Sequence, residues 1–359
     1  MPTDSDLFDA LSAVVDPYLR RPIGELGLLR EVSEESGLAT VGISVPVANW
    51  DAEPVGRVIA DAARAHDGVD EVQVDVAILD DQGQQALADR LKGETSIGGA
   101  GSRTRVIAVS SGKGGVGKSS VTTNTAVALA RAGHDVGVID ADVWGFSIPR
   151  MLGIDSPPQA LAELIIPPAA HGVRAISMDF FVPVDQAVVW RGPMLHKALE
   201  QFLNDVYWDE PEFLLIDMPP GTGDVAISIS QFLPRSQTVV VTTPQPTAQR
   251  VAKRAAAMAA KVNQEVLGIV ENMSWFTGDD GKRYEIFGSG GGQSLADELE
   301  VPLLGKVPLL PEMREAADRG VPVAIAAEGS DAAVAFDEIA RRIVELRPRV
   351  RTHPELIIR

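Results

Sequence analysis

Cysteine is absent from all 359 residues of this chain. Disulfide bonds, thiol catalysis and thiolate metal ligands are therefore excluded as properties of the chain itself. Long apolar runs are missing too, since no stretch of about eighteen uncharged apolar residues occurs. Residues 1–6 lack the basic and apolar regions of a signal peptide. These absences predict a soluble cytoplasmic protein with no membrane-spanning helix and no membrane partner.

Basic residues are few: 32 Lys and Arg stand against 50 Asp and Glu, which gives a net charge of −18. Nucleic-acid binding needs clustered Lys and Arg, so this balance argues against a nucleic-acid partner. Residues 1–92 contain 18 acids and 7 bases, a net charge of −11, which leaves −7 for the rest. A solvated surface and a docking face for a basic partner are both open interpretations of this acidic part.

What the chain does have is a phosphate-binding motif at residues 112–119, with the spacing G-x-x-x-x-G-K-[ST]. Its glycines allow backbone N–H groups to surround a polyphosphate, and Lys118 adds a positive charge. A predicted buried strand at 105–109 precedes the loop, and a predicted helix at 119–131 follows it, so the loop lies at a helix N-terminus. The sequence therefore predicts nucleotide contacts from Gly112, Lys113, Gly114, Gly115, Val116, Gly117, Lys118, Ser119 and Ser120.

Three carboxylates at the ends of predicted strands are candidates for the metal and water chemistry of such a site. Asp217 follows four apolar residues, the Walker B arrangement, and would hold Mg²⁺ together with Ser119. Asp140 and Asp142 alternate after another strand, which predicts that they share a face. Asp142 would orient or activate the attacking water, and Asp140 would support Mg²⁺. For each of these two residues, capping or solvating a loop is an alternative.

Strand and helix patterns alternate between residues 105 and 346. Short apolar runs predict strands at 105–109, 136–139, 173–177, 213–216, 238–241, 267–270 and 303–307. Helical patterns occupy 119–131, 193–206, 225–232, 247–262, 292–299, 311–318 and 332–346. The alternation predicts an α/β fold, a mostly parallel P-loop NTPase sheet with helices on both faces. Residues 154–168 are proline-rich and aperiodic, which predicts a loop.

The N-terminal part predicts a separate small α+β domain at 1–92. Its predicted helices are 7–15, 55–65 and 84–91, and its predicted strands are 27–32, 38–47 and 69–79. A Gly-rich stretch at 93–104 predicts a linker, so the ATPase domain would span 105–346 and be followed by a solvated tail at 347–359.

The pair Asp16-Pro17 and residues 23–28 resemble the small domain of metal–sulfur assembly factors, which is fused in front of certain P-loop ATPases. That family often places a Cys-Pro after the second strand. Residues 46–51 of this chain have no thiol there. We therefore interpret this domain as an interaction or scaffold module.

Lys113 is not required by an ordinary P-loop, and Gly112-Lys113-Gly114-Gly115 matches the deviant P-loop of the ParA/MinD-like ATPases. In that family this lysine reaches across a dimer interface to the partner's nucleotide. The resemblance implies a Mg²⁺-dependent ATPase and a homodimer with nucleotide at its interface. Lys113 would add positive charge where charge develops on the transferred phosphate, with Lys118 and Asp142 as the other catalytic residues.

Further motifs, at residues 140–153, 190–194, 217–224 and 271–274, resemble the Mrp/ApbC-type iron–sulfur cluster carrier proteins. This resemblance implies transfer of clusters to apoproteins, with iron–sulfur scaffolds or apoprotein clients as partners. It also implies that Asn272 and the backbone near Pro308 recognise adenine.

The resemblance ends at the metal ligands. Cluster-carrying members have a C-x-x-C pair between the segments matching 272–274 and 285–288, but residues 275–284 here contain none. Asp279 and Asp280 are hard ligands that suit an iron–sulfide cluster poorly, and 278–281 predicts a hairpin turn. The five histidines show no ligand spacing. Two functions stay open: an ATPase of iron–sulfur assembly, and a ParA/MinD-like nucleotide-dependent interaction or positioning protein without a cluster.

Overall fold

The computed structural model describes residues 4–92, 97–99, 101–143, 145–181, 192–221 and 223–347. Its chain forms two compact units: unit 1 comprises Met1–Glu94, Pro158–Pro168 and Asp205–Asp209, and unit 2 comprises Thr95–Pro157, Ala169–Asn204 and Glu210–Arg359. Several residues named above lie outside the described ones: 93–96 and 100 of the predicted linker, 348–359 of the tail, and Trp144, Trp190, Arg191 and Thr222 of the motifs.

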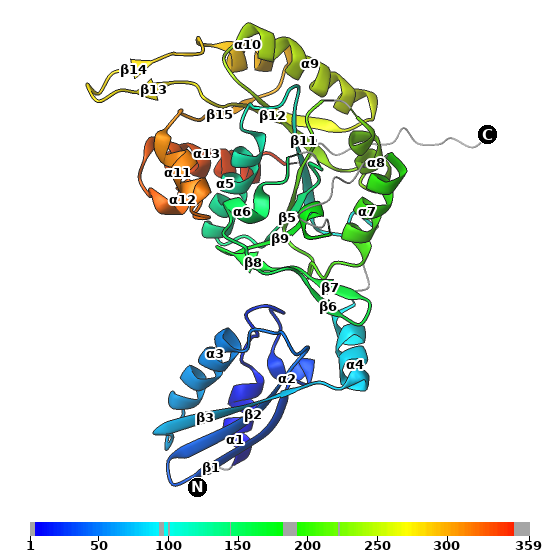
Figure 1. Ribbon diagram of the computed structural model, residues 1–359, viewed down its shortest axis with the longest axis vertical. Coiled ribbons are helices and arrows are strands. Elements are labelled where there is room, and N and C mark those ends of the chain that lie inside the picture. The colour runs from blue at the N-terminus through cyan, green and yellow to red at the C-terminus, as the bar shows by residue number, and fades with distance from the viewer. Residues whose placement is uncertain are drawn as a thin grey trace, which may run out of the picture. The chain divides into compact units, whose positions relative to one another are not determined.

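Unit 1 is built on a three-stranded sheet of order β1-β2-β3, with β1 and β2 antiparallel and β2 and β3 parallel (Figure 1). Helix α3 is the crossover that a parallel pair requires. It buries Val55, Ile59 and Ala63, which recur every four residues along one helix face. The elements are α1 Asp4–Ser12, α2 Ile23–Leu26, β1 Leu29–Glu35, β2 Leu38–Val45, α3 Glu53–Arg64, β3 Glu71–Ile78 and α4 Asp81–Leu91.

A hairpin from a distant part of the chain completes the core of unit 1. Strands β6 Gln159–Leu161 and β7 Leu164–Ile166 pair antiparallel, and their buried Leu161, Leu164 and Ile166 join the same apolar cluster as α4. The prediction of a loop at 154–168 is therefore wrong, because residues 159–166 form this hairpin. The two-residue turn contains Ala162 at φ +50° instead of the Gly or Asn that marks such turns, so the sequence lacks the usual hairpin signal.

Unit 2 contains an eight-stranded sheet of order β15-β12-β11-β4-β10-β5-β9-β8, parallel throughout except at β8 (Figure 1). The strands are β4 Arg105–Ser111, β5 Val136–Asp140, β8 Ala169–Ala170, β9 Val173–Ser177, β10 Phe213–Asp217, β11 Gln237–Thr242, β12 Glu265–Glu271 and β15 Leu303–Lys306. Strands β4, β5, β10 and β11 are almost wholly buried, as strands covered on both faces should be. The predicted α/β class is confirmed.

Helices cover both faces of this sheet. One apolar cluster joins it to α5, α12 and α13, and a second joins it to α9 and α10. Each strand and helix predicted between 105 and 346 is present, with ends that shift by at most two residues. The helices are α5 Lys118–Arg131, α6 Ile148–Met151, α7 Gly192–Asn204, α8 Asp224–Phe232, α9 Pro246–Lys261, α10 Gly291–Leu299, α11 Pro311–Asp318, α12 Val323–Ala326 and α13 Asp331–Glu345, with a 3₁₀ turn at Met178–Phe181.

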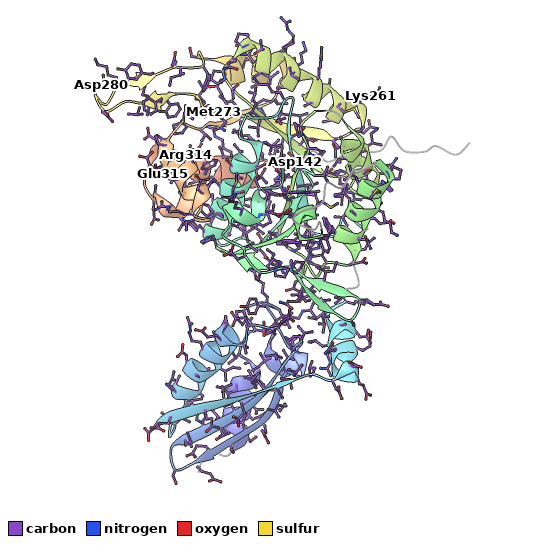
Figure 2. All side chains as sticks on the ribbon, viewed as in Figure 1. Asp142, Lys261, Met273, Asp280, Arg314 and Glu315 are labelled. Carbon is purple, nitrogen blue, oxygen red and sulfur yellow. The ribbon has the colours of Figure 1, made fainter. Side chains whose placement is uncertain are left out.

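A second hairpin, β13 Phe276–Thr277 with β14 Arg283–Tyr284, extends from unit 2 with Asp280 near its tip (Figure 2). The N–H of Gly278 donates to the carbonyl of Lys282 at 2.9 Å, so the turn predicted at 278–281 is confirmed. Within the described ranges, no helix is both long and apolar enough to cross a lipid bilayer.

Candidate functional site

The P-loop connects the central strand β4 to helix α5 and borders a cavity of about 370 Å³. Helix α5 begins at Lys118, directly after Gly117, and no described side chain caps its N-terminus. The first N–H groups of a helix have no partner within the helix, so this end favours an anion. The cavity lining is Ser111, Lys113, Gly114, Gly115, Gly117, Lys118, Ser119, Ser120, Asp142, Gly145, Ser147, Met151 and Pro220.

Two P-loop glycines meet distinct steric requirements. A Cβ at Gly112 would lie 2.2 Å from the backbone carbon of Val251, because helix α9 packs directly against the loop. Gly117 has φ +79°, and a Cβ there would lie 2.2 Å from the side-chain nitrogen of Asn272. Gly112 and Val116 are not among the residues that line the cavity, because Gly112 packs against α9 and the Val116 side chain is buried.

Lys118 and Asp217 form the buried centre of the site. The Lys118 ammonium lies 2.6 Å from Asp217 Oδ2 and 3.4 Å from Asp142 Oδ2. Asp217 is fully buried at the end of β10, and Lys118 is 6% exposed. Removing one partner from such a buried pair costs about 3–5 kcal/mol, because the remaining charge is left without compensation.

Two hydroxyl groups complete the surroundings of Asp217. Ser119 Oγ donates to Asp217 Oδ2 at 2.6 Å, and Thr122 Oγ1 donates to Asp217 Oδ1 at 2.7 Å. Thr122 lies one turn after Lys118 on α5 and was not identified from the sequence, although this spacing was a usable signal. An anionic carboxylate next to a serine hydroxyl is a donor set that suits Mg²⁺.

Asp140 lies beside this centre, but its carboxylate is directed elsewhere. It accepts hydrogen bonds from the N–H groups of Asp142, Ser147 and Ile148 at 3.1–3.2 Å and from Ser177 Oγ at 3.2 Å. Burial, and then the charge of Asp217, raise the pKa of Asp140 to about 7. The prediction that Asp140 and Asp142 share a face is wrong, because strand β5 ends at Asp140 and only Asp142 lines the cavity.

Lys113 lines the cavity from the other end of the loop. Its ammonium donates to Gln245 Oε1 at 3.3 Å, and Gln245 is the residue before α9. Nothing local in the sequence identifies Gln245 as a partner, since 132 residues separate it from Lys113. Gly145, Ser147, Met151 and Pro220 are further lining residues that sequence reasoning missed.

Asn272 and Pro308 lie on neighbouring segments. The N–H of Ser274 donates to the carbonyl of Val307, and the N–H of Leu309 donates to that of Trp275. Asn272 Nδ2 donates to the Val116 carbonyl at 2.9 Å, which joins this segment to the P-loop. Its Oδ1 is buried and accepts no hydrogen bond from any described residue. A buried acceptor of this kind suits an amino group of a ligand.

The β13–β14 hairpin, where the resemblance places thiolates, is held by other contacts. Arg283 stacks on Trp275, with its guanidinium carbon 4.5 Å from the ring centroid, and also pairs with Asp331 at 3.2 Å. Asp280 accepts from the Tyr284 hydroxyl at 2.9 Å. Searching the described residues reveals no group of three His, Cys, Asp or Glu that could hold a metal ion. The donors present do not fit an iron–sulfur cluster.

Two family models match this chain, one over each of its two parts. A family model described as NUBPL iron-transfer P-loop NTPase matches residues 102–344, and an iron–sulfur cluster assembly protein model matches residues 4–76. The iron–sulfur cluster carrier protein of Mycobacterium leprae is 44% identical, covering 89% of this chain and 87% of its own. That of Synechocystis is 40% identical, covering 96% and 97%.

Solved structures share the fold of about two thirds of this chain. An ADP-bound nucleotide-binding protein from Archaeoglobus fulgidus is 34% identical to this chain, with a TM-score of 0.54. The match covers 61% of this chain and 87% of that protein's chain. The Pyrococcus furiosus cell division ATPase MinD is 24% identical, with a TM-score of 0.52, and the match covers 68% of this chain and 99% of that chain. At this identity the likeness shows the fold alone. Fold and phosphate site together define a P-loop NTPase. Within that class, the chain belongs to the NUBPL iron-transfer P-loop NTPase family.

Proposed function

We propose that this protein is a cytoplasmic, Mg²⁺-dependent ATPase that dimerises around its nucleotide and serves iron–sulfur cluster assembly. One observation carries the proposal: the uncapped N-terminus of α5, with Lys118 and Ser119 gathered on the buried Asp217 beside a cavity. Its relatives in Mycobacterium and Synechocystis are named iron–sulfur cluster carrier proteins.

In this proposal the loop and α5 bind the phosphates. The N–H groups around Gly114 and Gly117 surround the polyphosphate, and Lys118 neutralises part of its charge. Ser119 and Asp217 hold Mg²⁺, with Asp140 supporting them from the neighbouring strand end. When bound, Mg²⁺ neutralises charge on the phosphate oxygens.

Asp142 lines the same cavity and accepts a hydrogen bond from the attacking water, which orients it toward the terminal phosphate. Lys113 contributes positive charge to the nucleotide of the second subunit. Asn272, with its buried unpaired Oδ1, and the backbone at Pro308 recognise adenine.

The cluster is the cargo of this proposed function and does not rest on residues of this chain. The chain has no cysteine, and its described residues include no group of three His, Cys, Asp or Glu that could hold a metal ion, so it acts through iron–sulfur scaffolds or apoprotein clients that hold the cluster themselves. The absence of cysteine also favours a second candidate, a nucleotide-switched interaction protein of the ParA/MinD type that has no role in cluster assembly.

Three measurements test these proposals. The first compares phosphate release and molar mass by light scattering with ATP and Mg²⁺, with ADP, and with ATP plus a chelator. The switch predicts turnover and dimers only with ATP and Mg²⁺, and monomers that release no phosphate would contradict it. The second is anaerobic reconstitution with iron and sulfide, in which we expect iron and acid-labile sulfide near zero per dimer. The third follows the transfer of a cluster from a loaded scaffold to an apoprotein. Acceleration of this transfer by the protein with ATP supports the first candidate, and its absence favours the second.

A further inference from the structure

Acidic residues are missing from one long segment of this acidic chain. No Asp or Glu occurs in residues 225–264, although an even spread of the chain's 50 acids would place about five or six there. The basic residues of the segment are Arg235, Arg250, Lys253, Arg254 and Lys261. Four of the five belong to α9, which contains no acid in its sixteen residues.

Helix α9 presents these cations on its solvent face. Its buried face is made of Ala248, Ala252, Ala255, Ala256 and Ala259, which pack toward the sheet. Arg250, Arg254 and Lys261 are exposed and follow the spacing i, i+4, i+11, so they align in one stripe about 16 Å long. Between Arg250 and Lys261 the other exposed residues are Lys253, Ala257 and Ala260.

The stripe is not neutralised by the surrounding unit. Lys253, which lies beside it, pairs with Glu298 of α10. Arg250, Arg254 and Lys261 form no ion pair with any side chain that the structure describes. Figure 2 places Lys261 at the end of α9, away from the sheet.

The exposed Arg235 is a further cation near the C-terminal end of α9. The Gln264 side chain donates to Ser236 Oγ at 2.6 Å, and Gln237 pairs with Glu265 across the adjacent strands. These contacts bring the residue before Ser236 to the end of the sheet where β11 and β12 begin, close to the C-terminal end of α9. We call the surface formed by Arg250, Arg254 and Lys261 the basic stripe.

We propose that the basic stripe is a docking site for an acidic helix of a partner protein. Carboxylates spaced four and seven residues apart on such a helix would face Arg250, Arg254 and Lys261. The small side chains of Ala257 and Ala260 leave room for the two helices to pack closely. Lys253, already paired within the unit, contributes little.

Other anionic partners fit less well. A membrane surface or a DNA duplex extends far beyond a 16 Å stripe and would meet the remainder of a chain whose net charge is −18. The exposed face of α9 also lacks the large apolar residues that insert into lipid and the aromatic residues that stack on bases. A compact acidic helix contacts only the stripe itself.

The test uses the full chain and a labelled synthetic helix of about twenty Ala and Glu residues, with glutamates four and seven residues apart. Binding is followed by fluorescence anisotropy at about 50 mM salt. A peptide with Gln in place of Glu is the control ligand. The test variant is Arg250→Glu/Arg254→Glu/Lys261→Glu. The matched control, Arg57→Glu/Arg64→Glu/Arg314→Glu, makes the same change in net charge at exposed arginines elsewhere.

We expect the parent and the matched control to bind the acidic helix alike, and the test variant to bind it at least about tenfold more weakly. Binding should also weaken as salt rises. Circular dichroism and ATP binding, equal in all three proteins, establish that they are folded. Equal affinity of the two variants, or no binding of the acidic helix by the parent, overturns the proposal. Tighter stripe-dependent binding of a DNA duplex or of phosphatidylserine vesicles overturns it as well.

Discussion

The ammonium of Lys113 donates a hydrogen bond to Gln245 at 3.3 Å, which joins the start of the P-loop to the residue before α9. This places the second lysine of the motif at the border of the nucleotide cavity, where Gln245, a neutral residue, accepts its hydrogen bond. A neutral amide does not compensate the positive charge of Lys113, so the lysine is available to a phosphate group.

Lys113→Ala should lower ATP turnover by about a hundredfold or more and abolish ATP-dependent dimerisation, because it removes the charge that supports phosphoryl transfer between subunits. Nucleotide binding by the single subunit should persist, since Lys118 remains. Gln245→Ala, which removes only the hydrogen-bond partner, is the control and should stay within about threefold of the parent. Parent-level turnover and dimerisation in Lys113→Ala would contradict the assigned role.

Asp142→Asn and Asp217→Asn should fail in different ways. Asp142→Asn should keep nucleotide binding and lower turnover by about a hundredfold, because the carboxylate that orients the water is lost while the shorter Lys118–Asp217 ion pair remains. Asp217→Asn should also lower the free energy of unfolding by about 3 kcal/mol, since Lys118 loses its buried counter-charge. Denaturant unfolding together with single-turnover kinetics separates the two outcomes. An equal stability loss in both variants would argue against the central role of Asp217.

Gly112→Ala and Gly115→Ala offer a matched pair within one loop. A Cβ at Gly112 meets the α9 backbone at 2.2 Å, so the substitution should cost about 3 kcal/mol or more. Gly115 has φ +76°, and no atom lies within 4 Å of the position that a Cβ would take. Gly115→Ala should therefore lower the free energy of unfolding by only about 1 kcal/mol, the cost of a left-handed backbone for alanine. Chemical denaturation of unit 2 measures both. The reverse order of stability would refute the packing of α9 on the loop.

The raised pKa of Asp140 predicts a pH dependence of stability. A carboxyl group whose pKa is higher in the folded state stabilises the folded protein fully at a pH below its ordinary pKa, which is 3.8 for Asp140. This contribution to the free energy of unfolding is lost as the pH rises through about 7. Asp140→Asn removes the titration. Between pH 5 and pH 8 the parent should therefore lose at least about 1 kcal/mol relative to Asp140→Asn. The exposed Asp179→Asn is the control and should track the parent. A constant difference for Asp140→Asn would contradict the prediction.

Leu161→Ala should destabilise unit 1 by about 2–5 kcal/mol, because Leu161 is fully buried in the apolar cluster of that unit. The half-buried Ile165 of the same hairpin provides the control, and Ile165→Ala should cost less. Hydrogen exchange measured separately over 4–92 and 223–347 locates the effect. Loss of protection confined to the second range would contradict the assignment of 158–168 to unit 1.

Much of this protein was determined by local sequence. The P-loop spacing at 112–119 predicts a phosphate site because backbone geometry and one lysine suffice to bind a phosphate. Unbroken apolar runs predict the buried strands, and the alternation of strands and helices predicts the parallel sheet. The absence of cysteine excludes thiolate ligands for an iron–sulfur cluster, since no fold can supply a thiolate that the chain lacks.

Only the tertiary structure decided how distant segments meet. Gln245 reaches Lys113 across 132 residues, and the hairpin at 159–166 packs into a core that begins 150 residues earlier in the chain, pairings that no local periodicity encodes. The different directions of Asp140 and Asp142 depend on where β5 ends. The basic stripe likewise depends on the fold. Its cations share one exposed face only because the alanine face of α9 packs against the sheet.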